Sequence, residues 1–335
     1  MKRTLFIVFV FLAGAGSACA ADANWVRVLT LQDYNTRVVL AGTLLLGLAS
    51  GLVGAFMVLR KKALMADAVS HATLPGLALA FLVMAAAGGT GKNLGGLLLG
   101  ATCTGLLGMG AVQLIRSTTR LKEDAALGIV LSVFFGLGVA LMGLVQKMET
   151  GSAAGLESFI YGKTASMLAS DGWRIALAAG SITALCLLLF KVLAVVCFDP
   201  DYARAQGWPV AVLDGLLMGM VVAVTVVGLQ AVGLILVVAL LVTPAAAARF
   251  WSDDLRHMVG LSALIGGLSC VLGALWSALV PDLPAGAMMV LVAALFFIIS
   301  LLAGRARGVV ARAWRYRLMV RRLQEAHARG EGMPP

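Results

Sequence analysis

The sequence predicts an all-α, polytopic bundle of about eight or nine membrane-spanning helices, and three observations support this fold class. Hydrophobic residues make up 61% of the 335 residues and charged residues only 13%, which lies outside the range of soluble domains. Apolar runs of about 20 residues recur along the chain, and each is long enough to cross a hydrocarbon core as a helix. Basic residues gather in alternate loops between these runs, as in membrane proteins of fixed orientation.

Residues 1–20 have the layout of a secretory signal peptide. Lys2 and Arg3 precede an apolar stretch that begins at Leu5, and Ala18-Cys19-Ala20 supplies a small-residue cleavage site. Cleavage would leave the N-terminus of the mature chain outside the cell membrane. An uncleaved membrane anchor is the alternative for this segment.

The transmembrane domain is predicted to extend over residues 34–304. Gly42, Gly47, Gly51 and Gly54 in its first apolar run indicate helices that approach each other closely. The expected spans lie near 38–59, 63–86, 94–115, 125–145, 173–196, 212–228, 231–249, 258–280 and 285–304.

Loop charge gives the orientation of these spans. A chain that starts outside and crosses nine times ends inside, so residues 305–335 are predicted to form a basic cytoplasmic tail in a multi-pass protein of the cytoplasmic membrane. The net charge of +10 could suggest nucleic acid, but its placement favours anionic lipid or a protein partner at the inner membrane surface. The loops expected inside contain Arg60, Lys61, Lys62, Arg116, Arg120, Lys122, Arg204, Arg249 and Arg256.

The second span contains ionisable residues that hydrocarbon should not tolerate without a function. Asp67 and His71 are four residues apart, so a helix presents them on one face, with Ser70 beside them. Their oxygen and nitrogen atoms suit Mn, Fe or Zn. Two ligands make a weak site, which suits an ion in transit that must also leave. Pro75-Gly76 is expected to break or kink this helix.

Two other interpretations of this pair are open at this point. Asp67 could cap the start of the helix, with His71 as its local partner. The same two side chains could instead form a proton relay.

The loop from Phe198 to Gly207 is the most polar of those expected inside. It begins with a proline turn, is predicted to form a short helix from about Tyr202, and stops at Gly207 before Pro209. A short helix held between two spans is a good docking element for a partner protein, although a plain connector explains the same residues.

The segment Gly88-Gly-Thr-Gly-Lys92 is similar to a phosphate-binding loop but lacks its defining residues. Ala86 stands where the first glycine of that motif belongs, and no Ser or Thr follows Lys92. We therefore expect no ATP site in this chain, no catalytic activity of its own and no tightly bound cofactor.

Four blocks of the sequence, in this order, resemble the permeases of ABC importers for manganese, zinc or iron. The resemblance extends from about Tyr34 to Arg317. The blocks are Leu59 to Gly76 (LRKKALMADAVSHATLPG), Lys122 to Ile129 (KEDAALGI), Phe198 to Gly207 (FDPDYARAQG) and Leu229 to Ala245 (LQAVGLILVVALLVTPA). One departure is Ala66, where the family often has glycine.

The resemblance implies a type II-like importer permease that moves divalent Mn, Zn or Fe as its substrate. Such a permease pairs with a second copy or a related chain, docks on two ATPase subunits, and receives the ion from an extracytoplasmic binding protein. The family's ion-contacting Asp and His match Asp67 and His71. Its ATPase-coupling loop matches Asp199 to Gly207, including Ala203 and Gln206.

Two hypotheses from other classes remain to be weighed against the permease. A secondary transporter would use Asp67 and His71 to couple metal movement to protons. An intramembrane enzyme would need a nucleophile and a base, and Ser70 beside His71 has no oxyanion pattern such as G-x-S-x-G to support it.

Overall fold

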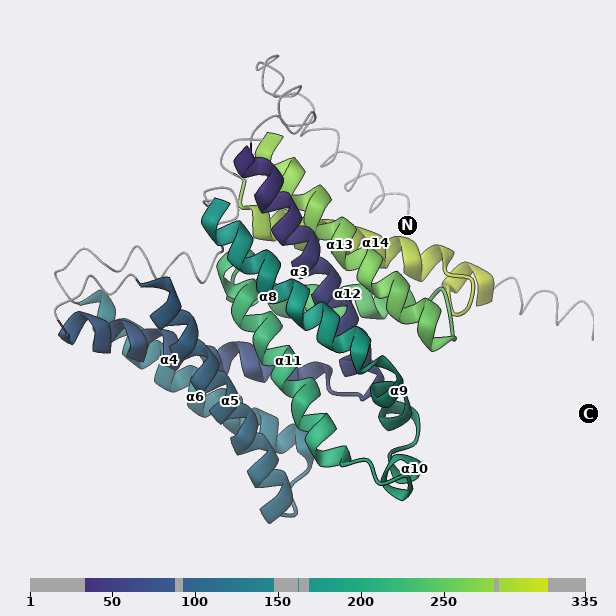
Figure 1. The fold of residues 1–335 in the computed structure, drawn as a ribbon, viewed down its shortest axis with the longest axis horizontal. Coiled ribbons are helices and arrows are strands. Elements are labelled where there is room, and N and C mark those ends of the chain that lie inside the picture. Colours follow the sequence, from purple (N-terminus) through teal and green to yellow (C-terminus); the bar gives the residue numbers. More distant parts are fainter. Residues whose placement is uncertain (1–33, 88–92, 148–161, 163–168, 280–282, 313–335) are drawn as a thin grey trace, which may run out of the picture.

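The computed structural model describes residues 34–87, 93–147, 162, 169–279 and 283–312, and every regular element in that part is a helix (Figure 1). This confirms the predicted all-α class. The helices are α3 (Tyr34–Leu59), α4 (Ala63–Ala86), α5 (Leu94–Thr118), α6 (Glu123–Gln146), α8 (Ala169–Leu188), α9 (Phe190–Phe198), α10 (Pro200–Ala205), α11 (Val210–Ala231), α12 (Leu234–Arg249), α13 (Leu255–Leu279) and α14 (Ala285–Ala303).

Some predicted features lie outside the described residues. They are the leader at 1–20, the segment from Gly88 to Lys92, and the tail from residue 313 onward. Cleavage of the leader, the orientation of both termini and the three-part division of the chain therefore stay predictions.

Eight of the described helices are long and apolar enough to cross a membrane, which supports a multi-pass membrane protein. They are α3, α4, α5, α6, α8, α11, α13 and α14. The other expected spans differ in detail. The stretch predicted as one span at 173–196 is divided at Leu189 into α8 and α9, and α12 has only 16 residues. A tight connection at Gly233, whose φ is +94°, separates α12 from α11.

Close glycine contacts hold α3 against α13, as the small residues of the first span predicted. A Cβ added to Gly47 would lie 2.4 Å from the carbonyl oxygen of Gly266, so the two backbones touch at this point. The Ser262 hydroxyl also donates a hydrogen bond of 2.7 Å to the carbonyl of Gly51. Helices that approach this closely form a rigid unit in lipid.

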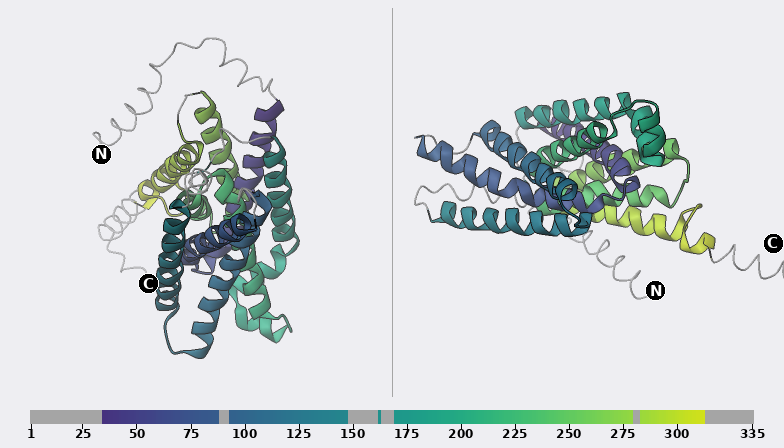
Figure 2. Two further views of the ribbon diagram at one scale, coloured as in Figure 1. Left: turned by 90° about the vertical axis from the view of Figure 1, so that its left-hand side faces the viewer. Right: turned by 90° about the horizontal axis from the view of Figure 1, so that it is seen from below.

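The described helices fall into two groups on either side of α11. Helices α4, α5 and α6 pack on one another, whereas α3, α8, α12, α13 and α14 form the other group (Figure 1). The view from below in Figure 2 shows the same division. Helix α11 contacts both groups. A turn of three residues, Arg60, Lys61 and Lys62, leads from the end of α3 to the start of α4. That turn therefore connects the two groups.

Candidate functional site

Asp67 and His71 lie on one face of α4, as their spacing predicted. Oδ1 of Asp67 is 3.5 Å from Nε2 of His71, which is longer than a good hydrogen bond. The Asp67 side chain is 45% exposed in the single chain and that of His71 is 23% exposed. The two groups are near enough to bind one ion together, and they do not form a good hydrogen bond with each other.

The imidazole of His71 packs against α6. Its ring meets Phe135 edge-on, with 4.8 Å between the ring centroids. Its Nδ1 atom is buried and has no hydrogen-bond partner among the described residues. A buried polar atom without a partner is costly. The nitrogen nearest to Asp67 is Nε2, so an ion shared by the two side chains would bind there.

The structure excludes the capping role for Asp67. The N-cap of α4 is Lys62, and α4 begins at Ala63, so Asp67 already lies in the second turn. Ser70 is also occupied, because its hydroxyl donates a 2.8 Å hydrogen bond to the Asp67 carbonyl. A hydroxyl bonded to its own helix in this way gives no support to a nucleophile at Ser70.

Of the two effects expected at Pro75-Gly76, a break is wrong, because α4 runs without interruption from Ala63 to Ala86. Neighbouring glycines make room for the proline turn. A Cβ on Gly138 of α6 would lie 3.1 Å from Cδ of Pro75, and one on Gly76 would lie 2.2 Å from the carbonyl oxygen of Gly100 in α5. Pro75 still has no N–H to donate to the carbonyl of His71 one turn earlier.

Asp67 and His71 do not complete a metal cage by themselves. Within the described ranges, no group of three or more His, Cys, Asp or Glu side chains is placed to hold a metal ion. One carboxylate and one imidazole can contribute two of the ligands of an Mn, Zn or Fe ion, and other ligands must come from water, backbone oxygen or another chain. The role of this pair stays a prediction.

The segment from Asp199 to Gly207 contains the short helix α10, as predicted, with its start two residues earlier. Asp199 caps the helix by accepting a 2.9 Å hydrogen bond from the Tyr202 N–H, and Pro200 occupies the first turn. Ala203 is fully buried and packs with Val196, Val210 and Leu213.

The other two predicted coupling residues end this segment. Gln206 is exposed, and its side-chain amide donates a 2.8 Å hydrogen bond to the Tyr202 hydroxyl. Gly207 has a φ of +84°, a backbone conformation that glycine adopts without strain. The start, the packing and the end of α10 are therefore set by Asp199, Ala203 and Gly207, respectively. Gln206 lies on the surface of this segment.

The sequence analysis missed the aromatic side chains around α10. Phe198, Tyr202 and Trp208 are 66%, 53% and 44% exposed, respectively. Exposed aromatic residues next to a short polar helix are typical of protein interfaces. Their signal in the sequence was two aromatic residues within the most polar loop, Phe198 and Tyr202, and a third, Trp208, directly after it.

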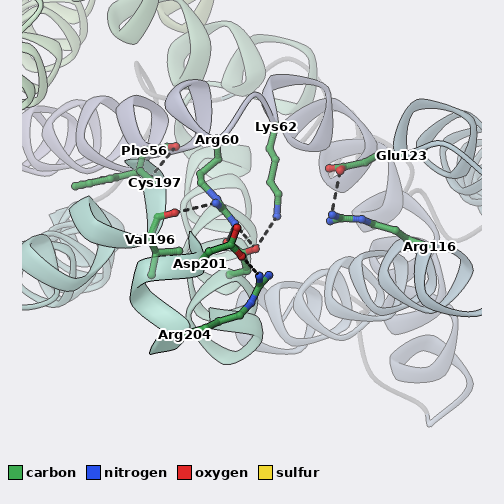
Figure 3. A network of polar contacts seen from close by, with 10 residues as sticks. Phe56, Arg60, Lys62, Arg116, Glu123, Val196, Cys197, Asp201 and Arg204 are labelled. Carbon is green, nitrogen blue, oxygen red and sulfur yellow. Dashed lines mark hydrogen bonds and ion pairs between the residues drawn. The ribbon is translucent and has the colours of Figure 1, made fainter. Parts of the chain in front are cut away.

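An ion cluster at the start of α4 was also missed. Arg60 donates hydrogen bonds of 2.6 and 2.5 Å to the two carboxylate oxygens of Asp214 and one of 2.9 Å to the carbonyl of Val196 (Figure 3). Lys62 lies 3.5 Å from the same carboxylate. Asp214 is an acidic residue in the first turns of an apolar span, which is the signal that singled out Asp67.

The fold and these polar groups define the class of the protein: a multi-pass helical membrane protein with ionisable side chains inside its bundle, as transport proteins have. Residues 32–304 match the ABC 3 transport family, and the chain belongs to this family. The resemblance seen in the four sequence blocks is thereby confirmed.

Two curated relatives and one solved structure show how close the similarity is. The chain is 44% identical over 295 residues to the manganese transport system membrane protein MntC of Bacillus subtilis (strain 168), covering 88% of this chain and 66% of that one, just under two thirds. It is 45% identical over 294 residues to the zinc transport system membrane protein TroC of Treponema pallidum (strain Nichols), covering 88% and 97%. PsaBC from Streptococcus pneumoniae, solved in complex with Fab, shares 32% identity at a TM-score of 0.73 and covers 89% of this chain and all of that chain.

Proposed function

We propose that this chain is the membrane-spanning permease subunit of an ATP-driven ABC importer for a divalent metal ion, Mn, Zn or Fe. The observation that carries the proposal is the Asp67–His71 pair on α4, with a buried Nδ1 atom that has no described partner. Membership of the ABC 3 transport family supplies the class of machine in which such a pair would act.

The ligand chemistry fits several metals. A carboxylate oxygen and an imidazole nitrogen bind Mn, Fe and Zn, and selectivity among these ions depends on geometry and availability more than on ligand type. Relatives named for manganese and for zinc are equally similar to this chain, at 44% and 45% identity. The substrate class is therefore a divalent transition metal rather than one named ion.

The exposure of Asp67 supports a paired assembly. Its carboxylate is 45% exposed in the isolated chain although it lies inside an apolar span. A charged group at that depth needs water or a protein partner. A second permease chain facing α4 would supply both a lined path for the ion and additional ligands.

The segment around α10 is the proposed contact with the ATPase. Loop charge predicts that it lies in the cytoplasm, and Phe198, Tyr202 and Trp208 offer an exposed aromatic surface there. An extracytoplasmic metal-binding protein would deliver the ion at the opposite end of the bundle. The chain would contribute the path and its partners the ATP hydrolysis and the capture of the ion.

Reconstitution tests this function. The purified permease, its ATPase and its binding protein are placed in proteoliposomes, and uptake of Mn and Zn is followed with and without ATP. We expect uptake that requires ATP hydrolysis and is unaffected by a proton uncoupler. Uptake that needs no ATP and collapses with the uncoupler would instead establish a proton-coupled secondary transporter.

A further inference from the structure

The ion cluster of Arg60, Lys62 and Asp214 joins three separate parts of the chain. Arg60 and Lys62 belong to the turn between α3 and α4, and Asp214 belongs to α11. Arg60 also donates to the carbonyl of Val196 in α9. The two contacts of Arg60 therefore lie on the helices immediately before and after the α10 segment (Figure 3).

The geometry of this cluster makes it stiff. One terminal nitrogen of the Arg60 guanidinium, Nη2, donates to both oxygens of Asp214, while the other, Nη1, donates to the carbonyl of Val196, so the planar group is held at two points. The side chains of Arg60, Lys62 and Asp214 are only 14%, 7% and 21% exposed, so water screens the pair little. Lys61 between the two cations has a φ of +58°, which an L-residue adopts only where its surroundings hold it.

The end of α9 and the start of α11, which Arg60 contacts, also pack against α10. Ala203 of α10 is buried against Val196 of α9 and against Val210 and Leu213 of α11. A displacement of α10 therefore bears on α9, which carries Val196, and on the first two turns of α11, which carry Asp214. Asp214 is also close to Lys62, which is the N-cap of α4, and Asp67 lies farther along the same continuous helix.

We propose that Arg60, Lys62 and Asp214 are positioning residues that make the start of α4 move together with the α10 segment. The proposal rests on the proposed function, because it assigns the cluster to the step between the ATPase contact at α10 and the ion-binding pair on α4. The cluster touches neither the ion nor the ATPase and acts through Asp67 and His71.

Other ion pairs at helix ends provide the contrast. Arg116 and Glu123 lie 3.4 Å apart and join α5 to α6, with side chains that are 46% and 30% exposed. This pair involves neither the start of α4 nor a helix next to α10. Loss of its charge removes a comparable ion pair without touching the proposed linkage, so Glu123→Gln is the matched control.

The first measurement is the number of metal ions transported per ATP hydrolysed, on assembled complexes isolated by gel filtration so that yield does not enter. We expect Arg60→Gln and Asp214→Asn to lower this ratio roughly five- to tenfold while ATP hydrolysis continues, the size of a typical coupling between two sites. Asp214→Glu, which keeps the carboxylate, should restore most of it, and Glu123→Gln should leave it unchanged.

The second measurement needs no metal. Spin labels are placed at Leu64, at the start of α4, and at Ala205, at the end of α10; both positions are exposed. In the complex with the unaltered cluster, the distance between these labels should stay constant when ATP is added. With Asp214→Asn it should change, because α10 then moves without α4.

A metal-to-ATP ratio that stays at the wild-type value in both Arg60→Gln and Asp214→Asn would overturn the proposal. A lowered ratio with an unchanged label distance would also overturn it, because the loss would then arise elsewhere. If the wild-type complex itself shows no ATP-driven uptake, the proposed function fails. The distance between the two labels then tests separately whether the cluster links α4 to α10.

Discussion

Two pairs of charged side chains have members at the start of α4, and their surroundings differ sharply: Asp67 and His71 both lie on α4, whereas Arg60 on the preceding turn pairs with Asp214 of α11. Asp67 and His71 are 3.5 Å apart, part-exposed, and leave the imidazole Nδ1 without a described partner. Arg60 and Asp214 share two short hydrogen bonds, and Arg60 has a third to Val196. The Asp67–His71 pair is loosely associated, whereas the Arg60–Asp214 pair is closely bound, although Nε of Arg60 also lacks a partner among the described residues.

This difference shows how to distinguish ionisable residues that bind an ion from those that stabilise the fold of a membrane protein. A close, part-buried ion pair is engaged with its own partner, and removing one member weakens the compensation of the charge that remains. A loose pair contributes little to the fold, so its loss costs little stability. We therefore expect the larger loss of stability at Arg60 and Asp214 and the larger loss of uptake at Asp67 and His71.

The largest effect is expected at the loose pair. Asp67→Ala or His71→Ala should reduce metal uptake by at least roughly 100-fold, because each removes a proposed direct ligand, whereas the loss of a group that only supports a ligand costs tenfold or more. Thermal unfolding of the detergent-solubilised chain should change little, since neither side chain anchors the bundle. Uptake is measured with radioactive or isotope-labelled metal in proteoliposomes.

The matched control for this prediction is the other histidine–aspartate pair in the described ranges. His257, in the first turn of α13, has its Nδ1 2.5 Å from Oδ2 of Asp254 just before that helix; both side chains are exposed, and this hydrogen bond lowers the pKa of Asp254. His257→Ala should leave uptake unchanged. Wild-type uptake by both α4 variants would remove Asp67 and His71 from the ion path.

The second effect concerns stability at the Arg60–Asp214 pair. Arg60→Gln leaves the Asp214 carboxylate with Lys62 alone at 3.5 Å, and Asp214→Asn leaves two part-buried cations without it, so each should lower the free energy of unfolding by about 2 kcal/mol. The double variant should lose no more than a single one, since the two act as a unit. Unfolding of the four proteins in detergent gives the interaction energy, and strictly additive losses would contradict a direct pair.

Much of this arrangement could be predicted from the sequence. Apolar runs near the length of a bilayer have few structural alternatives, so the helices and the shared face of Asp67 and His71 follow from composition and spacing. The cap at Asp199 and the glycine end at Gly207 follow likewise from local backbone chemistry.

Contacts between distant segments could not be predicted in this way. Arg60 and Asp214 are 154 residues apart, and no local pattern states that the two meet. Pro75 shows the same limit, because its effect on α4 depends on space left by Gly138 of α6 and Gly100 of α5. The exposure of Tyr202 likewise depends on how α10 is seated on α9 and α11.

The smallest expected effect concerns the contact between α4, which carries Asp67 and His71, and α5. Gly76 lies on α4 beyond Asp67 and His71, and a Cβ there would come within 2.2 Å of the Gly100 carbonyl and 2.1 Å of the Thr104 hydroxyl. Gly76→Ala should therefore force α4 and α5 apart and lower the free energy of unfolding by about 1–2 kcal/mol.

Gly110 of α5 is the control, because nothing lies within 4 Å of a Cβ built on it. Gly110→Ala should be neutral or slightly stabilising, since alanine favours a helix by up to about 1 kcal/mol over glycine. If α4 must be held rigidly for Asp67 and His71 to act together, Gly76→Ala should also lower uptake, whereas Gly110→Ala should not. Equal stability and equal uptake in the two variants would show that the close contact between α4 and α5 does not position the pair.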